Sequence, residues 1–467
     1  MRSMVHLVRH ALVALPCAWL LSSCGPGGPT PASRTTAAEA GVASSSDGGL
    51  DVITPAAIEA HMRFLASDLM EGREAGTRGY DLAANYVASQ FQLMGLQPAG
   101  DSVATGSSAT AGAAASADSI GSTAPGQQHT YFQRVPLQAH WLERAGARMV
   151  VVRAGGKATP LTLGTQFVVA SSPLHATSRA SAPAVFAGYG IDAPAFTHHD
   201  YDGLDVKGKI VVVLSGYPSS MPSEEGAHYG SGREKQRAAA AHGAVALVTV
   251  YTERFEKVSP WARNVRGMDS MSMSWVGPDG TPFVMAPSLQ AAGLMSPTDG
   301  AVLFEGAPKS YQEVRAEAAS GAPKGFPLAV SIEIAQRSRH ERRASANVVA
   351  VLPGSDPKLR AEHVVVLGHL DHEGIGASTG PSGSDGSAGS ADRIYNGAMD
   401  DAAGIAGLLE AARALTRAGQ APRRSVLFLA VTAEEKGLLG SEYFARNPAV
   451  PVSNLVAAVN IDMPILT

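Results

Sequence analysis

The chain has 467 residues, of which 45% are hydrophobic and 17% charged, so it is long enough for two or more domains with buried cores. Lysine and arginine number 37 against 41 aspartates and glutamates, a net charge of −4. This balance excludes a broad basic surface, and we expect no nucleic-acid partner. The only two cysteines, Cys17 and Cys24, lie near the N-terminus, so we expect no disulfide in the folded part.

Residues 1–24 have the pattern of a targeting segment. Arg2 and Arg9 precede an apolar run at 11–21 that is too short to span a bilayer and is typical of a signal-peptide core. The run ends at Leu21-Ser22-Ser23-Cys24, which resembles a bacterial lipobox and implies cleavage before Cys24 and lipidation of its thiol. We therefore expect a protein anchored by lipid to the membrane of a bacterial cell envelope, on the outer-membrane or periplasmic side. The alternative is a plain secretory signal and a secreted protein.

Residues 25–50 are rich in Gly, Pro, Ser, Thr and Ala without periodicity, which predicts a flexible tether. Folding is then predicted to begin with a helix, because Thr54 is a favourable cap and Pro55 a favourable first helical residue. One apolar face of that helix would carry Ile58, Met62, Leu65 and Leu69. A second helix would turn inward Tyr80, Ala83, Tyr86, Val87, Phe91 and Met94.

Within the N-terminal part at 51–181, residues 101–128 are rich in Ala, Ser and Gly and predict a disordered insertion that loops out of the fold. The pattern changes at 182–321, where strands are predicted at 185–191, 210–214 and 243–250 and a short helix at 233–242. The segments 185–191, 201–209 and 210–214 resemble a protease-associated domain, a β-rich module that is inserted into some peptidase domains. Residues 345–354 would then return the chain to the main sheet.

The stretch that follows predicts three buried strands, at 364–368, 425–431 and 455–461, with a helix at 402–418 between the first two. A residue that could hold a metal follows each strand. Ligands in open α/β sheets gather outside the carboxyl ends of the strands, so we expect one site to contain His369, Asp371, Asp400, Glu434, Glu435 and Asp462.

The chemistry of this set is that of a hydrolytic metal site. One imidazole with several carboxylates suits zinc first, with manganese or cobalt as alternatives, and the number of carboxylates suggests two ions. Extended neighbours point to opposite sides, so one of Glu434 and Glu435 could bind metal while the other moves protons. Taken singly, Glu434-Glu435 and Asp400-Asp401 could be ordinary helix ends and His369 a polar strand end; their order along the chain favours the metal site.

Four ordered motifs carry a family resemblance, namely His369-Leu370-Asp371, Gly397-Ala398-Met399-Asp400-Asp401-Ala402-Ala403-Gly404, Ala433-Glu434-Glu435-Lys436-Gly437-Leu438-Leu439-Gly440-Ser441 and Asn460-Ile461-Asp462-Met463. The set resembles family 28 of the metallopeptidases, the dizinc aminopeptidases. The resemblance implies an α/β fold with an open, mixed, mostly parallel sheet and helices on both faces, the zinc exopeptidase fold. It also implies that His369 and Asp462 ligate one zinc, that Glu435 ligates the other, and that Asp400 bridges both.

By the same resemblance Glu434 is the general base, Asp371 is the carboxylate that orients His369, and the peptide bond between Asp400 and Asp401 is cis. His372 and Glu373 match no family position and are expected to be ordinary loop residues. The last metal ligand of the family is a histidine beyond the Asp462 motif, so we expect the catalytic part at 322–467 to be C-terminally incomplete. The expected activity is removal of N-terminal residues from peptides. The alternatives are a carboxypeptidase and a non-catalytic binding protein with an incomplete metal site.

Overall fold

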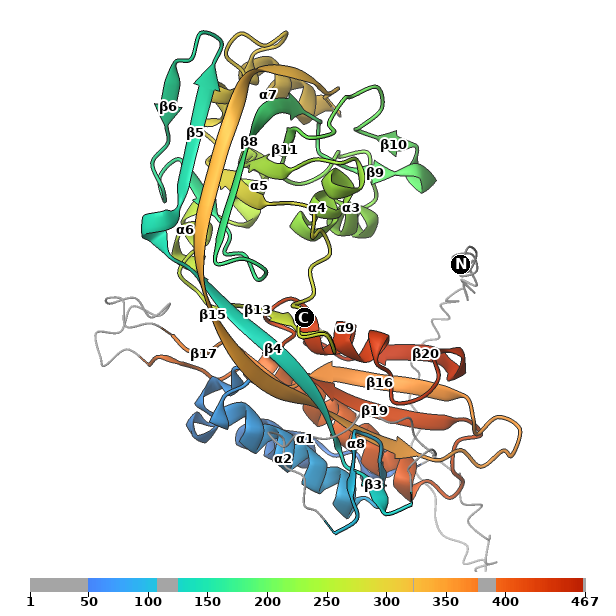
Figure 1. The fold of residues 1–467 in the computed structure, drawn as a ribbon. Helices are drawn as coiled ribbons and strands as arrows, with labels where there is room; N and C mark the ends of the chain where they lie inside the picture. Colours follow the sequence, from blue (N-terminus) through green and yellow to red (C-terminus); the bar gives the residue numbers. More distant parts are fainter. Residues whose placement is uncertain (1–48, 107–124, 322, 377–391, 465–467) are drawn as a thin grey trace, which may run out of the picture. The chain divides into compact units, whose positions relative to one another are not determined.

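The computed structural model describes residues 49–106, 125–321, 323–376 and 392–464 (Figure 1). The predicted signal segment with Cys24, residues 25–48 of the predicted tether and residues 107–124 of the predicted insertion lie outside these ranges. Within the described ranges, no helix combines the length and the apolar character that crossing a membrane requires.

The first sheet contains the elements that position the candidate site. Its strands lie in the order β20 (Leu455–Asn460), β16 (His363–His369), β19 (Ser425–Val431), β15 (Phe326–Leu352) and β4 (Phe132–Leu142). β16 is parallel to both β19 and β20, whereas β15 is antiparallel to β19 and to β4. The three strands predicted at 364–368, 425–431 and 455–461 are thus confirmed, although β20 is an edge strand with mostly exposed side chains rather than a buried one.

Helices cover both faces of this sheet, as predicted. α1 (Pro55–Leu65), α2 (Arg78–Leu93) and α8 (Ala403–Arg417) bury their apolar faces against Val348 and Phe428. On the other face α9 (Leu439–Arg446) packs through Phe444 against Val349 and Leu429. Neighbouring residues of one strand, such as Val348 and Val349, thus pack into the cores on opposite faces of the sheet, because side chains alternate across a strand.

The two N-terminal helices are confirmed, with one correction. The Thr54 hydroxyl accepts a hydrogen bond from Ala57 N at 3.2 Å and caps α1. Leu69, predicted on the apolar face, is 71% exposed, because α1 ends at Leu65 and the chain turns into η2 (Asp68–Arg73), where Met70 is buried instead.

The predicted disordered insertion is wrong at both of its ends. β2 (Ser102–Ala104) pairs with β3 (Gln127–His129), and the buried carboxylate of Asp101 accepts a hydrogen bond from Arg134 N at 2.8 Å. The low-complexity composition therefore predicted both ends of the insertion wrongly. A short antiparallel strand pair is held by main-chain hydrogen bonds and does not depend on apolar side chains.

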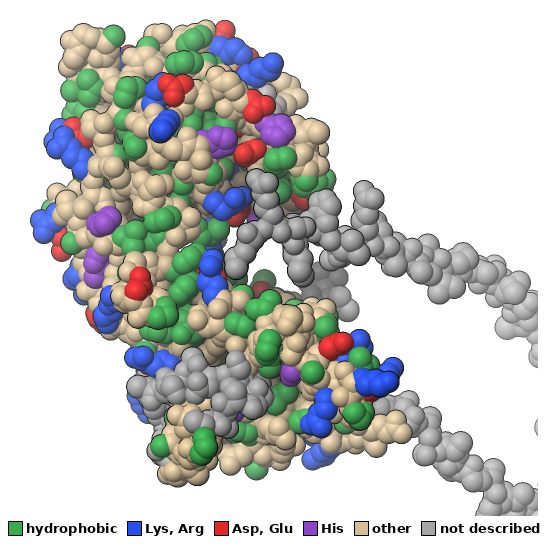
Figure 2. Space-filling model, turned by 45° about the vertical axis from the view of Figure 1, so that its right-hand side comes forward, with side chains coloured by type: hydrophobic (Ala, Val, Ile, Leu, Met, Phe, Trp, Pro, Cys, Tyr) green, Lys and Arg blue, Asp and Glu red, His purple; other side chains and the backbone are tan. Residues whose placement is uncertain are grey.

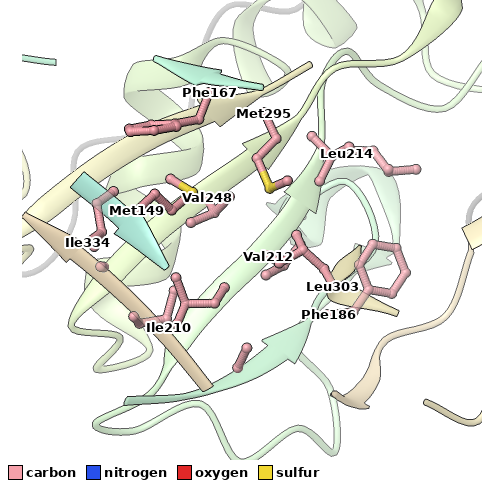
Figure 3. Close-up of a cluster of buried hydrophobic side chains, with 14 of the residues drawn as sticks. Met149, Phe167, Phe186, Ile210, Val212, Leu214, Val248, Met295, Leu303 and Ile334 are labelled. Carbon is pink, nitrogen blue, oxygen red and sulfur yellow. The ribbon is translucent and has the colours of Figure 1, made fainter. Parts of the chain in front are cut away.

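The inserted region forms a second sheet, which shares the strand β15. Its parallel strands are β8 (Thr177–Phe186), β11 (Ile210–Leu214), β12 (Ala246–Val250) and β14 (Ala291–Met295). The first half of β15 pairs antiparallel with β8 and with β5 (Arg148–Arg153). Figure 3 shows the core of this sheet, where Met149, Val248 and Ile334 meet; the core reaches from Leu142 to Ile334 and so beyond both ends of 182–321.

The predicted strand at 210–214 is β11, and the predicted helix at 233–242 is α4 (Gly232–Ala241). The other helices of the inserted region are α3 (Ser223–Tyr229), α5 (Glu253–Val258), α6 (Trp261–Gly267) and α7 (Tyr311–Ser320). The smaller strands are β1 (Gln97–Pro98), β6 (Ala158–Pro160), β7 (Phe167–Val169), β9 (Asp192–Ala193), β10 (His198–His199), β13 (Ser272–Trp275), β17 (Gly374–Ile375) and β18 (Ile394–Tyr395). On the face in Figure 2, acidic and basic side chains are interspersed rather than gathered by sign.

Candidate metal centre

The six predicted site residues follow the carboxyl ends of β16, β19 and β20, or precede α8. His369 is the last residue of β16, Glu434 and Glu435 come shortly after β19, and Asp462 comes two residues after β20. Because these three strands are parallel, their carboxyl ends meet at one edge of the sheet. The structure therefore brings the side chains together, as the strand order in the sequence predicts.

His369 lies at the centre of the cluster and is buried. Its Nε2 atom lies 2.8 Å from Asp400 Oδ1 and 3.7 Å from Asp462 Oδ1. Burial alone would lower the pKa of His369, but the surrounding carboxylates, Asp371 first among them, more than offset this and raise it above the ordinary value. The imidazole is therefore surrounded by negative charge, which is the environment of a metal ligand as well as of a protonated histidine.

Asp371 is fully buried and holds the main chain of both glutamates. Its carboxylate accepts hydrogen bonds from Glu434 N at 3.0 Å and from Glu435 N at 3.2 Å. The carboxylate lies 4.0 Å from His369 Nδ1, whereas the main-chain oxygen of Asp371 lies 3.1 Å from that atom. In this structure the carbonyl of Asp371 contacts the imidazole, and the carboxylate positions the loop after β19. Burial raises the pKa of Asp371 to about 6.

The peptide bond between Asp400 and Asp401 is cis, as the family resemblance implies. The two side chains have different surroundings, because the Asp400 carboxylate is partly exposed while Asp401 is fully buried. Asp401 accepts hydrogen bonds from the main-chain nitrogens of His369, Gly404 and Met463. Burial raises the pKa of Asp401 to about 7. Asp401 had no predicted role, although it stands next to Asp400 in the motif.

The adjacent glutamates have opposite electrostatic environments. Burial, with the charges of Asp371 and Glu435 added, raises the pKa of Glu434 to about 7. The pKa of Glu435 is lowered, mainly by its contact with His372. One carboxyl can therefore exchange a proton near neutral pH, while the other stays ionised as a ligand must.

His372 is another residue that sequence reasoning missed. Its Nδ1 atom lies 2.6 Å from Glu435 Oε1, close enough for an ion pair. Both atoms are buried without another hydrogen-bond partner among the described residues. The signal available in the sequence was its position directly after the His369-Leu370-Asp371 motif.

Arg73 connects the N-terminal helices to the loops of the site. Its guanidinium is 1% exposed and donates hydrogen bonds to the main-chain oxygens of Leu65, Leu370, Asn396 and Gly397, at 2.5 to 2.9 Å. Burial lowers the pKa of Arg73 to about 10, so the side chain stays charged at neutral pH. The last two acceptors belong to the loop that leads into Asp400, so Arg73 helps to position that carboxylate.

Two groups of side chains in the described ranges could each hold an ion. One group comprises His369, Asp401 and Asp462, and the other comprises His372, Asp400 and Glu435, with the ligand atoms of each group within 4.8 Å of one another. Each offers one imidazole and two carboxylates, a donor set that suits zinc. The orphaned atoms of His372 and Glu435 fit the same interpretation, because buried polar atoms require partners.

Comparison with known proteins points to one family. The model of Peptidase family M28 matches residues 347–465, which contain all four motifs. A probable leucine aminopeptidase 2 from Aspergillus oryzae is 33% identical over 178 residues, 37% of this chain and 30% of that protein. Leupeptin-inactivating enzyme 1 from Streptomyces exfoliatus is 34% identical over 119 residues, 25% of this chain and 22% of that protein. The chain thus spans less than a third of the length of these curated relatives.

Among solved structures, an aminopeptidase from Aneurinibacillus sp. strain AM-1 is similar with a TM-score of 0.44 and 17% identity, covering 89% of this chain and 72% of that one. A Peptidase M28 precursor from Shewanella amazonensis has a TM-score of 0.36 and 18% identity, covering 90% and 75% of the two chains.

Proposed function

We propose that this chain is a zinc-dependent exopeptidase that releases N-terminal residues from peptides. The proposal starts from the match of residues 347–465 to the model of Peptidase family M28. The observation that carries the proposal is the pair of donor groups at the carboxyl ends of parallel strands, each with one imidazole and two carboxylates. The name of the relative from Aspergillus oryzae, a probable leucine aminopeptidase 2, supports action at the N-terminus of a peptide.

In this proposal the two groups hold one divalent ion each, with zinc favoured and manganese or cobalt as alternatives. His369 and Asp462 would bind the first ion and Glu435 the second, and His372 is a candidate further ligand of the second. Asp400 would help to hold both ions, because its carboxylate lies 2.8 Å from His369 Nε2 and also belongs to the group with Glu435. When bound, the ions would polarise the scissile carbonyl and lower the pKa of water.

Glu434 would take the proton of the attacking water and deliver it to the leaving amine. A pKa of about 7 suits both steps, because a group that titrates near the working pH accepts and donates protons with similar ease. Asp371 would act indirectly, since its hydrogen bonds to the main-chain nitrogens of Glu434 and Glu435 fix the loop that carries both side chains.

The proposal is tested by hydrolysis of leucyl-p-nitroanilide with the full chain. Activity should vanish after treatment with a zinc chelator such as dipicolinate and return when zinc is added. The N-acetylated substrate should resist hydrolysis, because an aminopeptidase requires a free α-amine. Release of C-terminal residues from an N-blocked peptide would identify a carboxypeptidase, and tight zinc binding without hydrolysis of either substrate would identify a non-catalytic binding protein.

A lipid anchor at Cys24 is a further part of the proposal and rests on the sequence alone. The apolar run at 11–21 followed by Leu21-Ser22-Ser23-Cys24 supports export and lipidation in the bacterial envelope. Wild-type chain expressed in a bacterium should partition with membranes and carry acyl mass, and Cys24→Ser should lose both. Equal partitioning of the two forms would refute the anchor.

A further inference from the structure

A cavity of about 1500 Å³ opens in the inserted region and shares no lining residue with the candidate metal centre. It lies at the carboxyl ends of the four parallel strands. Tyr189 follows β8, Ser215 and Gly216 follow β11, Thr252 follows β12, and Thr298 follows β14. In open α/β sheets this is the crevice where ligands bind, so the position of the cavity marks it as a second site.

Aromatic side chains form part of the walls of the cavity. The rings of Tyr189, Tyr217, Phe255, Phe304 and Tyr311 line it, and Phe304 stacks on Tyr311 with their centroids 5.4 Å apart. Tyr189 donates its hydroxyl to Ala318 O and Tyr311 donates its hydroxyl to Pro297 O. Because these two hydroxyls are already bonded within the protein, the rings of Tyr189 and Tyr311 offer a ligand apolar surface.

Two of the cations that line the cavity form no ion pair within the described part of the chain. Glu253 pairs with Arg315, and Glu305 pairs with Arg153, so both lining carboxylates are neutralised. Arg254 and Lys257 are exposed and form no ion pair with any carboxylate of the described residues. Arg254 lies with its guanidinium carbon 5.4 Å from the centroid of the Tyr217 ring. Free positive charge and an aromatic surface therefore lie together.

The floor of the cavity is held in place by a buried lysine. Lys235, 1% exposed, donates hydrogen bonds of 2.6 Å to the main-chain oxygens of Leu214 and Gly216. Both acceptors line the cavity, and the ammonium lies 5.6 Å from the centroid of the Tyr189 ring. The segment after β11 is therefore fixed before a ligand arrives, which lowers the entropic cost of binding.

We propose that this cavity binds the C-terminal segment of a peptide, with the free carboxylate at Arg254 and Lys257 and an apolar last side chain against the aromatic walls. The volume favours a ligand of several residues, since pockets for drug-sized molecules hold about 300–1,000 Å³. The proposed function enters this proposal at one point: it explains where such peptides come from. A peptidase that works from the N-terminus encounters peptides whose C-termini are free. The site itself needs no peptidase activity.

The test is calorimetry on the full chain with the N-acetylated tetrapeptide Ala-Ala-Ala-Phe, as the free acid and as the C-terminal amide. Acetylation removes the α-amine, so the probe is not an aminopeptidase substrate. The acid should bind at least about tenfold more tightly than the amide, the effect of about 1.4 kcal/mol from a charged contact. Equal affinities, or no binding of either form at millimolar concentration, would overturn the proposal.

Variants locate the binding. Arg254→Ala combined with Lys257→Ala should weaken binding of the acid at least about tenfold and leave binding of the amide unchanged. Ala316→Trp should abolish binding of both, because Ala316 is an exposed helical residue whose enlarged side chain would fill the cavity. Arg263→Ala is the matched control, since Arg263 is exposed on α6 and does not line the cavity. Unchanged affinity of the acid in the double variant would overturn the proposal.

Two further arms separate this site from its alternatives. Asp400→Asn should bind the acid like wild type, whereas loss of binding would place the peptide at the metal centre and overturn the proposal. Inorganic phosphate should compete only weakly; complete displacement of the peptide by equimolar phosphate would show that the cations bind any anion, which also overturns it. A chain that hydrolyses no peptide but binds the acid through Arg254 would refute the proposed function and leave this site standing.

Discussion

His372 Nδ1 lies 2.6 Å from Glu435 Oε1, and neither atom has a hydrogen-bond partner among the described residues. This relationship changes the role of a residue that the motif comparison passed over. An imidazole and a carboxylate that face each other at this distance, with Asp400 beside them, form a group that a divalent ion could join.

We therefore expect His372→Ala to weaken the binding of the zinc ion that we propose for the group of His372, Asp400 and Glu435. The loss should be at least the roughly 10–100-fold that removal of an outer-shell partner costs, because the imidazole would be a direct ligand. Zinc titration against a chromophoric chelator measures the affinity, and His175→Ala, an exposed histidine of the inserted region, is the control. Two zinc ions held as tightly by the variant as by wild type would show that His372 is not a ligand.

The second prediction concerns Glu434. Glu434→Gln should keep the zinc content and the fold but lower turnover of aminoacyl-nitroanilides by about 10²–10⁴-fold, the usual effect of losing a general acid and base. Glu373→Gln is the control, because Glu373 is a nearby carboxylate that faces Lys436 at 3.5 Å rather than the metal centre. Normal turnover of Glu434→Gln would remove Glu434 from the role.

The parts of the fold that follow from local pattern were predictable. Apolar runs predicted β16 and β19, and Thr54 with Pro55 predicted the start of α1. The length of β15, 27 residues, was not predictable, because its two halves pair with strands of different sheets and only the tertiary arrangement keeps the chain extended between them. A local pattern carries no information on such a shared strand.

The candidate site divides in the same way. The motifs predicted His369 and Glu434 as neighbours in space, and His369 Nε2 lies 4.0 Å from Glu434 Oε2, because both residues stand at the ends of parallel strands. Arg73 and Asp401 were missed, because their contacts are to main-chain atoms of distant segments, which leave no mark on the local sequence. Polar side chains whose partners are main-chain atoms of distant segments can be recognised only from a structure.

Arg73 provides the third prediction. Arg73→Lys keeps the charge but loses the planar fork that reaches four carbonyl oxygens, so we expect the unfolding free energy to fall by about 3 kcal/mol or more. Urea unfolding measures the loss. Arg78→Lys, an exposed residue that pairs with Glu71 on the surface, should cost less than about 1 kcal/mol. Equal unfolding free energies of the two variants would show that the hydrogen bonds of Arg73 to the four carbonyl oxygens do not stabilise the fold.

The fourth prediction is a pH dependence that arises at His140. Burial, with His340 opposite on β15, lowers the pKa of His140 from its ordinary 6.5 to about 4. The folded state therefore favours the neutral ring of His140. The contribution of this ring to the unfolding free energy is complete above pH 6.5 and is lost as the pH falls towards 4. The loss should reach about 3 kcal/mol relative to His140→Gln, measured by urea unfolding at several pH values. If the unfolding free energies of wild type and variant changed with pH in the same way, His140 would not be the origin of the pH dependence.

The last prediction concerns the contact between the inserted region and the loop that carries Glu434 and Glu435. Arg233 of α4 donates hydrogen bonds to Gly437 O at 2.8 Å and to Glu442 Oε2 at 3.0 Å. Gly437 lies two residues after Glu435, so this contact restrains the segment that must hold both glutamates in place. Because the guanidinium is partly exposed, the contact should add less than about 1 kcal/mol to global stability.

Arg233→Ala should therefore leave the unfolding free energy nearly unchanged but lower kcat/KM severalfold, since a freer loop spends less time in the reactive arrangement. Arg237→Ala is the matched control, because Arg237 lies one turn further along α4 and, among the described residues, its ion pair is with Glu234 of the same helix. Glu442→Ala should reproduce the effect, and the double variant should be no worse than either single one if the two side chains act together. Additive losses, or equal losses in the Arg237 control, would show that the contact does not position the loop.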